Sequence, residues 1–321
     1  MSMKHTVTSS QLVGRLLFAL LLALSPSAVA AEINLVAFGD WGWMNSAAER
    51  ATAQRIAAYA RTNHIDFDAA LLLGDNFYGA MPGGVSDPRW KAEFEQMYDA
   101  SVLDMPFYAA LGNHDYKSGK AEAELAYAQQ HPDSRWKMPA RWYRVEIPAD
   151  KPVVSVLVLD SNAPKLEERW SDQLAWLKGE LAKSRPGNWV VAIAHHPVFS
   201  NGEHGDTPQL LKDWAPLFRK YRVDFFLSGH DHQLEHLEVD GWPTSFVVAG
   251  GGGAALGILK RDDRGPFSRT LHGFFHLQLT ADLAHGKFIS VDGKPVHEFT
   301  RSAGGEVKVV QTTGRDKPGR D

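Results

Sequence analysis

The sequence of 321 residues contains no cysteine. This absence excludes thiol nucleophiles, disulfide frameworks, iron–sulfur clusters and cysteine-ligated zinc. It leaves the compartment open, because a core of this size needs no disulfides in any environment. Any chemistry must therefore come from oxygen- and nitrogen-bearing side chains, and 14 histidines are among them.

An excess of positive charge is also missing. Lys and Arg number 34 against 38 Asp and Glu, so the formal net charge is −4 with the histidines neutral. A nucleic-acid binder that works through a broad basic surface is therefore not expected. The hydrophobic share of 44% and the charged share of 22% are typical of a globular protein.

Long apolar runs are missing except near the N-terminus. Lys4 and Arg15 precede the apolar residues 16–24, and a small-residue site at residues 28–30 follows. This order is typical of a secretory signal peptide, and the run is too short to span a bilayer of about 30 Å. We predict a signal peptide at residues 1–30 and an exported protein, periplasmic or secreted, with no membrane association after cleavage. A buried helix or a retained anchor is the alternative.

The remaining chain alternates strands with helices and then continues with strands alone. Strands are predicted at residues 33–38, 69–73, 107–111, 153–159, 189–194 and 223–227, and later at 234–239, 245–249, 274–279, 287–291 and 306–311. Helices are predicted at residues 46–62, at 87–100, from about Ser171, and at 207–221. Continuous apolar strands indicate sheets buried on both faces. We therefore predict one α/β domain at residues 31–311, a four-layer sandwich of two packed mixed β-sheets flanked by α-helices, and a flexible tail at 312–321.

Five of the predicted strands end in the same way, with small residues followed by Asp, Asn or His. The segments are Gly39-Asp40, Gly74-Asp75-Asn76-Phe77-Tyr78, Gly112-Asn113-His114-Asp115, Ala194-His195-His196-Pro197 and Gly229-His230-Asp231-His232. Ligand sites of open α/β sheets form beyond the carboxyl ends of strands, and glycine lets the backbone turn sharply there. Each segment alone could be an ordinary turn. All five in order predict one shared crevice.

The side chains of these segments form a donor set without sulfur. Two carboxylates, one amide, three or four imidazoles and one phenol suit iron, manganese or zinc. The set exceeds one tetrahedral shell, so we expect two metal ions that share a bridging carboxylate. Such pairs lie about 3.5–4 Å apart and clamp the attacking and leaving oxygens of an in-line displacement.

Taken together, the five segments resemble the signature motifs of the calcineurin-like metallophosphoesterases. More narrowly, they resemble the purple acid phosphatases, especially the small, tartrate-resistant mammalian type. Most metallophosphoesterases carry Asp-x-His in the first motif, whereas here Gly42 stands two residues after Asp40. The second motif offers Tyr78 instead, three residues after Asp75, as in purple acid phosphatases. A tyrosinate ligand favours a hard trivalent ion such as Fe(III).

The resemblance implies a role for each residue of the site. The implied ligands of Fe(III) are Asp40, Tyr78 and His232. Those of a divalent Fe, Zn or Mn ion are Asn113, His195 and His230, and Asp75 would bridge the two ions. His114 and His204 would act on the substrate, with Asp115 orienting the His114 ring and His196 supporting the ligands from behind. For His204, a solvated loop position is an equally good alternative.

The resulting expectation is a secreted acid phosphatase that hydrolyses phosphate monoesters by in-line attack of a metal-bound hydroxide. Its expected substrates are small phosphate esters. Whether they include phosphopeptides is left open. Two alternatives stay open: a Mn/Zn phosphodiesterase or nucleotidase on the same site, and a non-catalytic metal- or phosphate-binding protein. No nucleic-acid partner is expected, and the oligomeric state is left open.

Overall fold

The structure is a computed structural model that describes residues 1–3, 32–183, 187–314 and 316–317. The predicted signal peptide falls almost wholly on residues outside this description, as do residues 315 and 318–321 of the predicted tail. Among the described helices, none combines the length and the hydropathy that crossing a bilayer requires.

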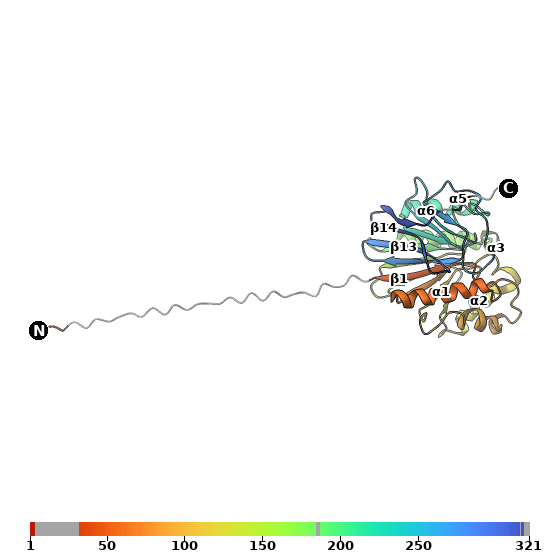
Figure 1. Ribbon diagram of the computed structural model, residues 1–321, viewed down its shortest axis with the longest axis horizontal. Coiled ribbons are helices and arrows are strands. Elements are labelled where there is room, and N and C mark those ends of the chain that lie inside the picture. The colour runs from red at the N-terminus through yellow and green to blue at the C-terminus, as the bar shows by residue number, and fades with distance from the viewer. Residues whose placement is uncertain (4–31, 184–186, 315, 318–321) are drawn as a thin grey trace. The chain divides into compact units, whose positions relative to one another are not determined.

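Eight strands form the first sheet (Figure 1). They are β1 (Ile33–Phe38), β2 (Ala69–Leu72), β3 (Phe107–Ala109), β4 (Trp136–Lys137), β12 (Gly273–Leu279), β13 (Leu283–Ser290), β14 (Pro295–Ser302) and β15 (Val307–Thr312). Their order is β15-β14-β13-β12-β1-β2-β3-β4. The strands from β1 to β4 pair in parallel, and the others pair antiparallel.

Seven strands form the second sheet. They are β5 (Tyr143–Ile147), β6 (Val154–Val158), β7 (Trp189–Ile193), β8 (Phe225–Ser228), β9 (Leu234–Glu238), β10 (Ser245–Ala249) and β11 (Phe267–Arg269). Their order is β11-β9-β10-β8-β7-β6-β5. The central strands β10, β8, β7 and β6 are parallel, and antiparallel strands flank them on both sides.

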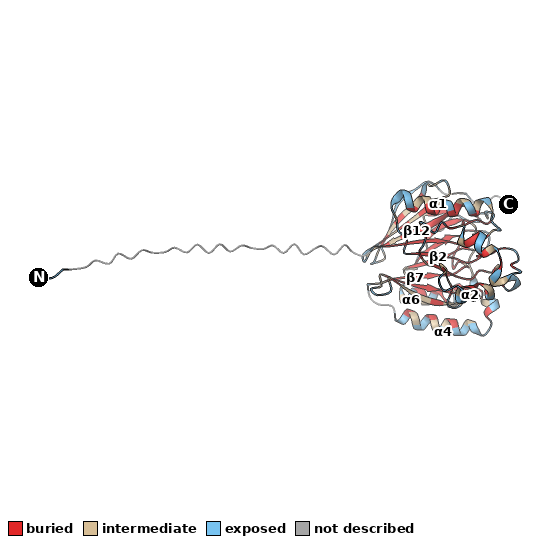
Figure 2. Ribbon diagram, turned by 90° about the horizontal axis from the view of Figure 1, so that it is seen from below, coloured by how far each residue is buried: buried red, intermediate tan, exposed pale blue. Residues whose placement is uncertain are grey.

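Helices cover the outer faces of the two sheets, as Figure 2 shows for α1 on one side and for α4 and α6 on the other. The α-helices are α1 (Ala47–Asn63), α2 (Lys120–Gln130), α3 (Ala163–Leu166), α4 (Arg169–Ala182), α5 (Pro208–Asp213) and α6 (Ala215–Tyr221). Three short helical turns are η1 (Gly84–Ser86), η2 (Trp90–Glu95) and η3 (Lys117–Gly119). The predicted four-layer sandwich is therefore confirmed.

Buried strands with two apolar faces explain the layering. In β7, Val191 and Ile193 belong to the core between the sheets, whereas Val190 and Ala192 pack beneath the outer helices. Side chains alternate between the faces of a strand, so a continuous apolar run fills both cores at once. This is why the strand predictions, which relied on such runs, agree with the observed strands to within a few residues.

The helix predictions are less accurate. The first helix is confirmed with its capping box, in which the Ser46 side chain accepts from the Glu49 backbone N–H and the Glu49 side chain accepts from the Ser46 N–H. The helix predicted at residues 87–100 is wrong in extent, because only the π-helix η2 forms there. The Arg135 guanidinium binds the backbone carbonyls of Glu95, Tyr98 and Leu103, which holds that segment in another conformation.

The helix predicted at residues 207–221 is divided at Trp214 into α5 and α6. Pro216 follows at once, and a proline has no N–H to continue the hydrogen-bond pattern of α5. The sequence patterns also missed α2, α3, β4, β5, β11 and β14.

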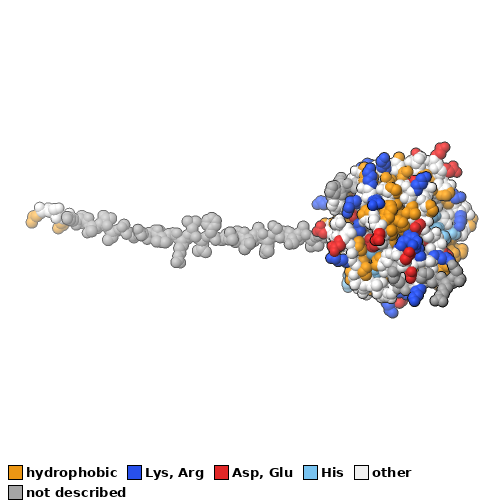
Figure 3. All heavy atoms as spheres, turned by 90° about the horizontal axis from the view of Figure 1, so that it is seen from above, with side chains coloured by type: hydrophobic (Ala, Val, Ile, Leu, Met, Phe, Trp, Pro, Cys, Tyr) orange, Lys and Arg blue, Asp and Glu red, His pale blue; other side chains and the backbone are white. Residues whose placement is uncertain are grey.

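The C-terminal segment extends the first sheet. β15 reaches Thr312, one residue into the predicted tail, and the Asp316 carboxylate accepts a hydrogen bond from the Thr270 N–H at 2.8 Å. On the face drawn in Figure 3, basic side chains are interspersed with acidic and hydrophobic ones.

Candidate metal centre

The five predicted segments meet beyond the carboxyl ends of parallel strands of both sheets. Three follow β1, β2 and β3 of the first sheet, and two follow β7 and β8 of the second. The Gly39 N–H donates to the Ala249 carbonyl at 2.8 Å, which joins the sheets at this edge. A Cβ built on Gly39 would lie 3.3 Å from the Gly229 Cα, so glycine allows the two sheets to approach this closely.

Three predicted ligands have a left-handed backbone. The φ angles are 58° at Asp40, 51° at Asp75 and 71° at His230. Such conformations cost non-glycine residues about 1–3 kcal/mol each and cluster at functional sites. Here they turn the chain sharply after β1, β2 and β8 and direct three side chains into the shared crevice.

Asp40, Tyr78 and His232 form one group, which we call the oxygen-rich triad. The Tyr78 hydroxyl lies 3.1 Å from Asp40 Oδ1 and 3.1 Å from His232 Nε2. The distance from His232 Nε2 to Asp40 Oδ1 is 3.4 Å. The three donor atoms thus form a nearly equilateral triangle, as three ligands of one ion do.

Asn113, His195 and His230 form a second group, the nitrogen-rich triad. His195 Nε2 lies 2.9 Å from Asn113 Oδ1 and 3.1 Å from His230 Nδ1. The rings of His195 and His230 are 4.9 Å apart and steeply inclined. Their nitrogens can therefore address one point without stacking of the rings.

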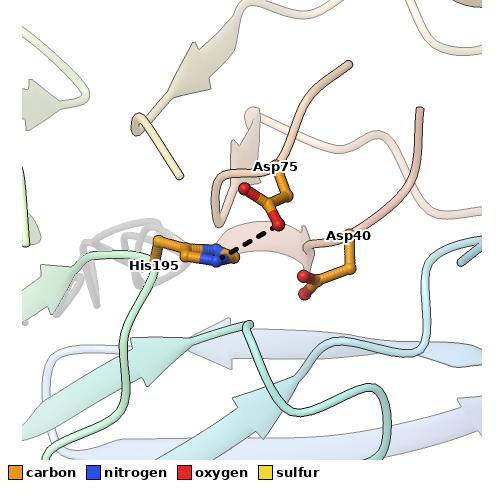
Figure 4. Close-up of side chains that lie close together, drawn as sticks. All are labelled: Asp40, Asp75 and His195. Atoms are coloured by element: carbon orange, nitrogen blue, oxygen red, sulfur yellow. Dashed lines mark ion pairs between the residues drawn. The ribbon is translucent and has the colours of Figure 1, made fainter. Parts of the chain in front are cut away.

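Asp75 lies between the triads. Figure 4 shows its carboxylate directed toward His195, with Asp40 beside it. Asp75 Oδ2 is 3.4 Å from His195 Nε2, and donor atoms of Asp40, Asp75 and His195 all lie within 4.8 Å of one another. The other oxygen, Oδ1, accepts a hydrogen bond from the His114 N–H at 2.7 Å. The Asp75 carboxylate therefore lies next to a donor of each triad, Asp40 and His195.

Backbone carbonyls select the ring tautomers of two histidines. His195 Nδ1 lies 3.0 Å from the Leu73 carbonyl, and His232 Nδ1 lies 2.6 Å from the Ala255 carbonyl. A carbonyl only accepts, so Nδ1 carries a proton in both rings, and in the neutral form of each ring the lone pair lies on Nε2.

Burial sets the electrostatics of both triads. Burial raises the pKa of Asp40, and burial together with the charges of Asp115 and Asp40 raises the pKa of Asp75 well above its usual range. Burial and the same two carboxylates, Asp40 and Asp75, also raise the pKa of Tyr78. Burial is the largest single influence on His232 and disfavours its charge, but the hydrogen bond to Asp40, the charges of Asp40 and Asp75 and the Ala255 carbonyl together outweigh it and raise its pKa to about 9. Burial and neighbouring histidines lower the pKa of His195 and His230 well below the usual range.

These directions describe acidic groups that resist ionisation and, apart from His232, ligand histidines that stay neutral. A cation would favour the ionised form of each acidic group. Carboxylate, phenol, amide and neutral imidazole donors are those that iron, zinc and manganese take, so the donor set fits two such ions.

Gly42 explains why the first segment supplies only one ligand. A Cβ at this position would lie 1.8 Å from the Asn76 carbonyl oxygen, so no side chain fits. The close approach also lets the Gly42 carbonyl accept the Tyr78 N–H at 2.9 Å. The segment that excludes a histidine is therefore the one that holds the backbone of Tyr78.

Each triad has a non-ligand histidine beside it. The His114 ring lies 4.4 Å from the Tyr78 ring, and the His204 ring lies 4.2 Å from the His230 ring. Burial and the charges of Lys117 and Lys120 lower the pKa of His114 to about 4. A hydrogen bond from His204 Nδ1 to the Asp231 carboxylate at 2.8 Å raises the pKa of His204.

Asp231 received no role from the sequence, although it stands between two predicted ligands. Its carboxylate also accepts the His204 N–H at 3.0 Å, so it holds both ring and backbone of that residue. The His204 side chain is 46% exposed, so this residue is anchored by Asp231 and still open to solvent. A carboxylate buried inside a His-x-His segment was the signal that could have revealed it.

Asp115 does not orient the His114 ring as expected. Its carboxylate accepts the backbone N–H groups of Asn76, Phe77 and Gly112 instead, at 2.7 to 3.2 Å. The buried acid thus fixes the loop between Asp75 and Tyr78. His196 Nδ1 lies 2.8 Å from the Ser161 hydroxyl, and its ring lies 4.4 Å from the His230 ring.

Comparison with known proteins yields a consistent set of relatives. The sequence model of the family "Calcineurin-like phosphoesterase" matches residues 33–234. "Tartrate-resistant acid phosphatase type 5" of Mus musculus is 31% identical over 286 residues, which cover 82% of this chain and 84% of the relative. Its Homo sapiens counterpart is 34% identical over 260 residues, which cover 74% and 78%. "Purple acid phosphatase 17" of Arabidopsis thaliana is 28% identical over 307 residues, covering 87% of each chain.

Solved structures show the same fold. Purple acid phosphatase PPD1 from yellow lupin (Lupinus luteus) seeds superposes with a TM-score of 0.68 at 19% identity, over 85% of this chain and 54% of that one. GAP50 of Plasmodium superposes with a TM-score of 0.70 at 22% identity, over 89% of this chain and 91% of that one.

Proposed function

This chain belongs to the calcineurin-like phosphoesterases as a homologue of the purple acid phosphatases, and we propose that it binds Fe(III) at the oxygen-rich triad and a divalent ion at the nitrogen-rich triad. Its relatives are phosphoric monoester hydrolases with two metal ions, so the chain is a hydrolase of phosphate esters. The proposal concerns which ions bind, which residues hold them and how the ester is cleaved.

One observation carries the assignment of iron. The Tyr78 hydroxyl lies 3.1 Å from both Asp40 Oδ1 and His232 Nε2, while Gly42 leaves no room for a histidine ligand. A phenolate and a carboxylate together match a hard trivalent ion better than a divalent one. Asn113, His195 and His230 are neutral donors and would hold divalent Fe, Zn or Mn, and Asp75 would bridge the ions.

The two ions, when bound, polarise the phosphoryl oxygens and lower the pKa of water so that a nucleophile exists near neutrality. The chain's own residues supply the rest. Asp231 holds His204 through Nδ1, which leaves Nε2 free to protonate the leaving oxygen as the ester bond breaks. His114 lies against Tyr78 and would contact the substrate on the opposite side.

We further propose that the protein is exported through residues 1–30 and acts on small phosphate esters and phosphopeptides. The proposed reaction involves no covalent enzyme intermediate, and the chain contains no cysteine that could form one through a thiol.

The test is metal analysis of natively purified protein, paired with its visible spectrum and its hydrolysis of p-nitrophenyl phosphate. The proposal expects one iron and one further ion per chain, and an absorption band from tyrosinate-to-Fe(III) charge transfer. A colourless, fully active, iron-free enzyme that prefers bis(p-nitrophenyl) phosphate would favour the Mn/Zn phosphodiesterase instead. Metal binding without hydrolysis of either ester would favour the non-catalytic binder.

A further inference from the structure

Arg89 binds the two loops that carry the oxygen-rich triad, although it belongs to none of the predicted motifs. Its Nη1 donates to the Tyr78 carbonyl at 2.6 Å and to the Ala80 carbonyl at 3.2 Å. Its Nη2 donates to the Gly42 carbonyl at 3.3 Å. One guanidinium thus connects the segment after β1 to the segment after β2.

Glu93 fixes the orientation of that guanidinium. Arg89 Nε and Nη2 bind the two carboxylate oxygens at 2.7 and 2.6 Å, one turn apart in the chain. The side chains are 16% and 5% exposed. Such a two-pronged charged pair is directional, and only the planar fork of arginine can bind a carboxylate and several carbonyls together.

The backbone of Tyr78 is therefore held on both sides. Its N–H donates to the Gly42 carbonyl at 2.9 Å, and its own carbonyl accepts from Arg89. The Gly42 carbonyl accepts hydrogen bonds from both the Tyr78 N–H and Arg89 Nη2. Gly42 can lie this close to the loop that carries Tyr78 only because it has no side chain. A shift of this backbone would move the phenol oxygen relative to Asp40 and His232.

We propose that Arg89 is a positioning residue for Tyr78, and that the Arg89–Glu93 pair sets the placement of the phenol oxygen in the oxygen-rich triad. The inference rests on the proposed function in treating Tyr78 as a metal ligand. Residues that orient ligands from outside commonly change metal affinity by about 10- to 100-fold when replaced.

Arg135 offers a matched control in the same chain. Its guanidinium also binds three backbone carbonyls, those of Glu95, Tyr98 and Leu103, and its side chain is 11% exposed. Both arginines also lie over aromatic rings. Arg135 makes none of its hydrogen bonds to the loops of the triads. Its replacement should therefore lower the stability of the fold without affecting Tyr78.

The experiment compares Arg89→Lys with Arg135→Lys in the full chain. Hydrogen exchange of the metal-free proteins should be faster at the amides of residues 76–80 in Arg89→Lys only. In the iron-loaded proteins, Arg89→Lys should shift the charge-transfer band and speed iron release to a chelator about tenfold or more. Arg135→Lys should leave both unchanged while lowering the melting temperature.

Glu93→Gln provides a second variant if Arg89→Lys fails to fold, and a smaller shift in the same direction is expected from it. The inference would be overturned if the Arg89 and Arg135 variants showed equal hydrogen exchange, equal band position and equal iron release. A coloured wild-type protein would in that case leave the proposed function standing. A wild type that binds no iron would remove the proposed function. The exchange result in metal-free protein would still decide whether Arg89 holds Tyr78.

Discussion

The two triads lie at the same edge of the two sheets. Burial raises the pKa of the acidic groups in one triad and lowers the pKa of the histidines in the other. In the oxygen-rich triad, burial raises the pKa of Asp40 and of Tyr78, so both groups resist ionisation until a cation is present. In the nitrogen-rich triad, burial lowers the pKa of His195 and His230, so the imidazoles are already in the form that binds a metal. Under the proposed function, a strongly charged ion would ionise the acidic groups of the first triad, and a divalent ion would suit the neutral donors of the second.

The supporting residues differ in the same way. Asp231 anchors His204 beside the nitrogen-rich triad, whereas His114 beside the oxygen-rich triad is approached by the Lys117 ammonium, 3.1 Å from Nε2. The comparison teaches that each triad has its own neighbouring histidine and that, of these two rings, the His204 ring is the one bound by a carboxylate, whereas His114 is bound by a carboxylate only through its backbone N–H.

The largest effect is expected from replacing Asp75, which lies between the two triads. Asp75→Ala should lower kcat/KM for p-nitrophenyl phosphate at least about a thousand-fold, because a residue shared by both ions is worth more than a single transition-state hydrogen bond, which contributes about 10²–10³. Metal analysis should show that both ions are depleted. Asp172→Ala, at an exposed position of α4, is the control. Retention of both ions by Asp75→Ala would contradict the bridging role.

Gly42→Ala should damage the oxygen-rich triad alone. The added methyl meets the Asn76 carbonyl at 1.8 Å, so the unfolding free energy should fall by about 3 kcal/mol, the upper end for overpacking. Chemical denaturation of metal-free protein measures this, and metal analysis should show loss of iron with the divalent ion retained. Gly179→Ala, which meets nothing within 4 Å in α4, should be neutral or stabilising. Equal stability of the two variants would disprove the steric argument.

Replacing His204 and His114 one at a time should distinguish the roles of these two histidines in catalysis. In His204→Asn, kcat/KM should fall about a hundred-fold for an alkyl phosphate, whose leaving oxygen needs a proton, and much less for p-nitrophenyl phosphate. The slope of rate against leaving-group pKa measures this. His114→Asn should lower rates without steepening that slope. A steeper slope in the His114 variant would reverse the assignment.

Tyr78→Phe should have the smallest effect on rate and the largest on colour. The ring contacts with Trp43 and His114 remain, so the fold is kept. Asp40, His232 and Asp75 would still hold the iron, so kcat/KM should fall only about tenfold, no more than on loss of a residue that orients a ligand. The visible band should vanish while the divalent ion stays bound. Tyr59→Phe, whose hydroxyl contacts His276, is the control. A band that survives in Tyr78→Phe would assign the colour to another group.

Much of the fold followed from local pattern. The strands were predictable because apolar runs must be buried wherever they lie, and α1 was predictable because its capping box is formed by residues three apart. The helix expected at residues 87–100 was not, because Arg135, far along the chain, captures the carbonyls that a helix would need. Long-range polar contacts of this kind leave no periodic mark in the sequence.

The sequence by itself determined the donor inventory, the family resemblance and the absence of a histidine at Gly42, since each depends on residue identity at a strand end. The tertiary structure decided which donors share a triad, that Asp115 supports a loop, that Asp231 holds His204, and that Arg89 holds Tyr78. The physical reason is that parallel strands bring their carboxyl ends to one edge whatever their order in the chain. The distances among side chains at that edge depend on how closely two sheets approach, and here Gly39 and Gly229 allow that approach.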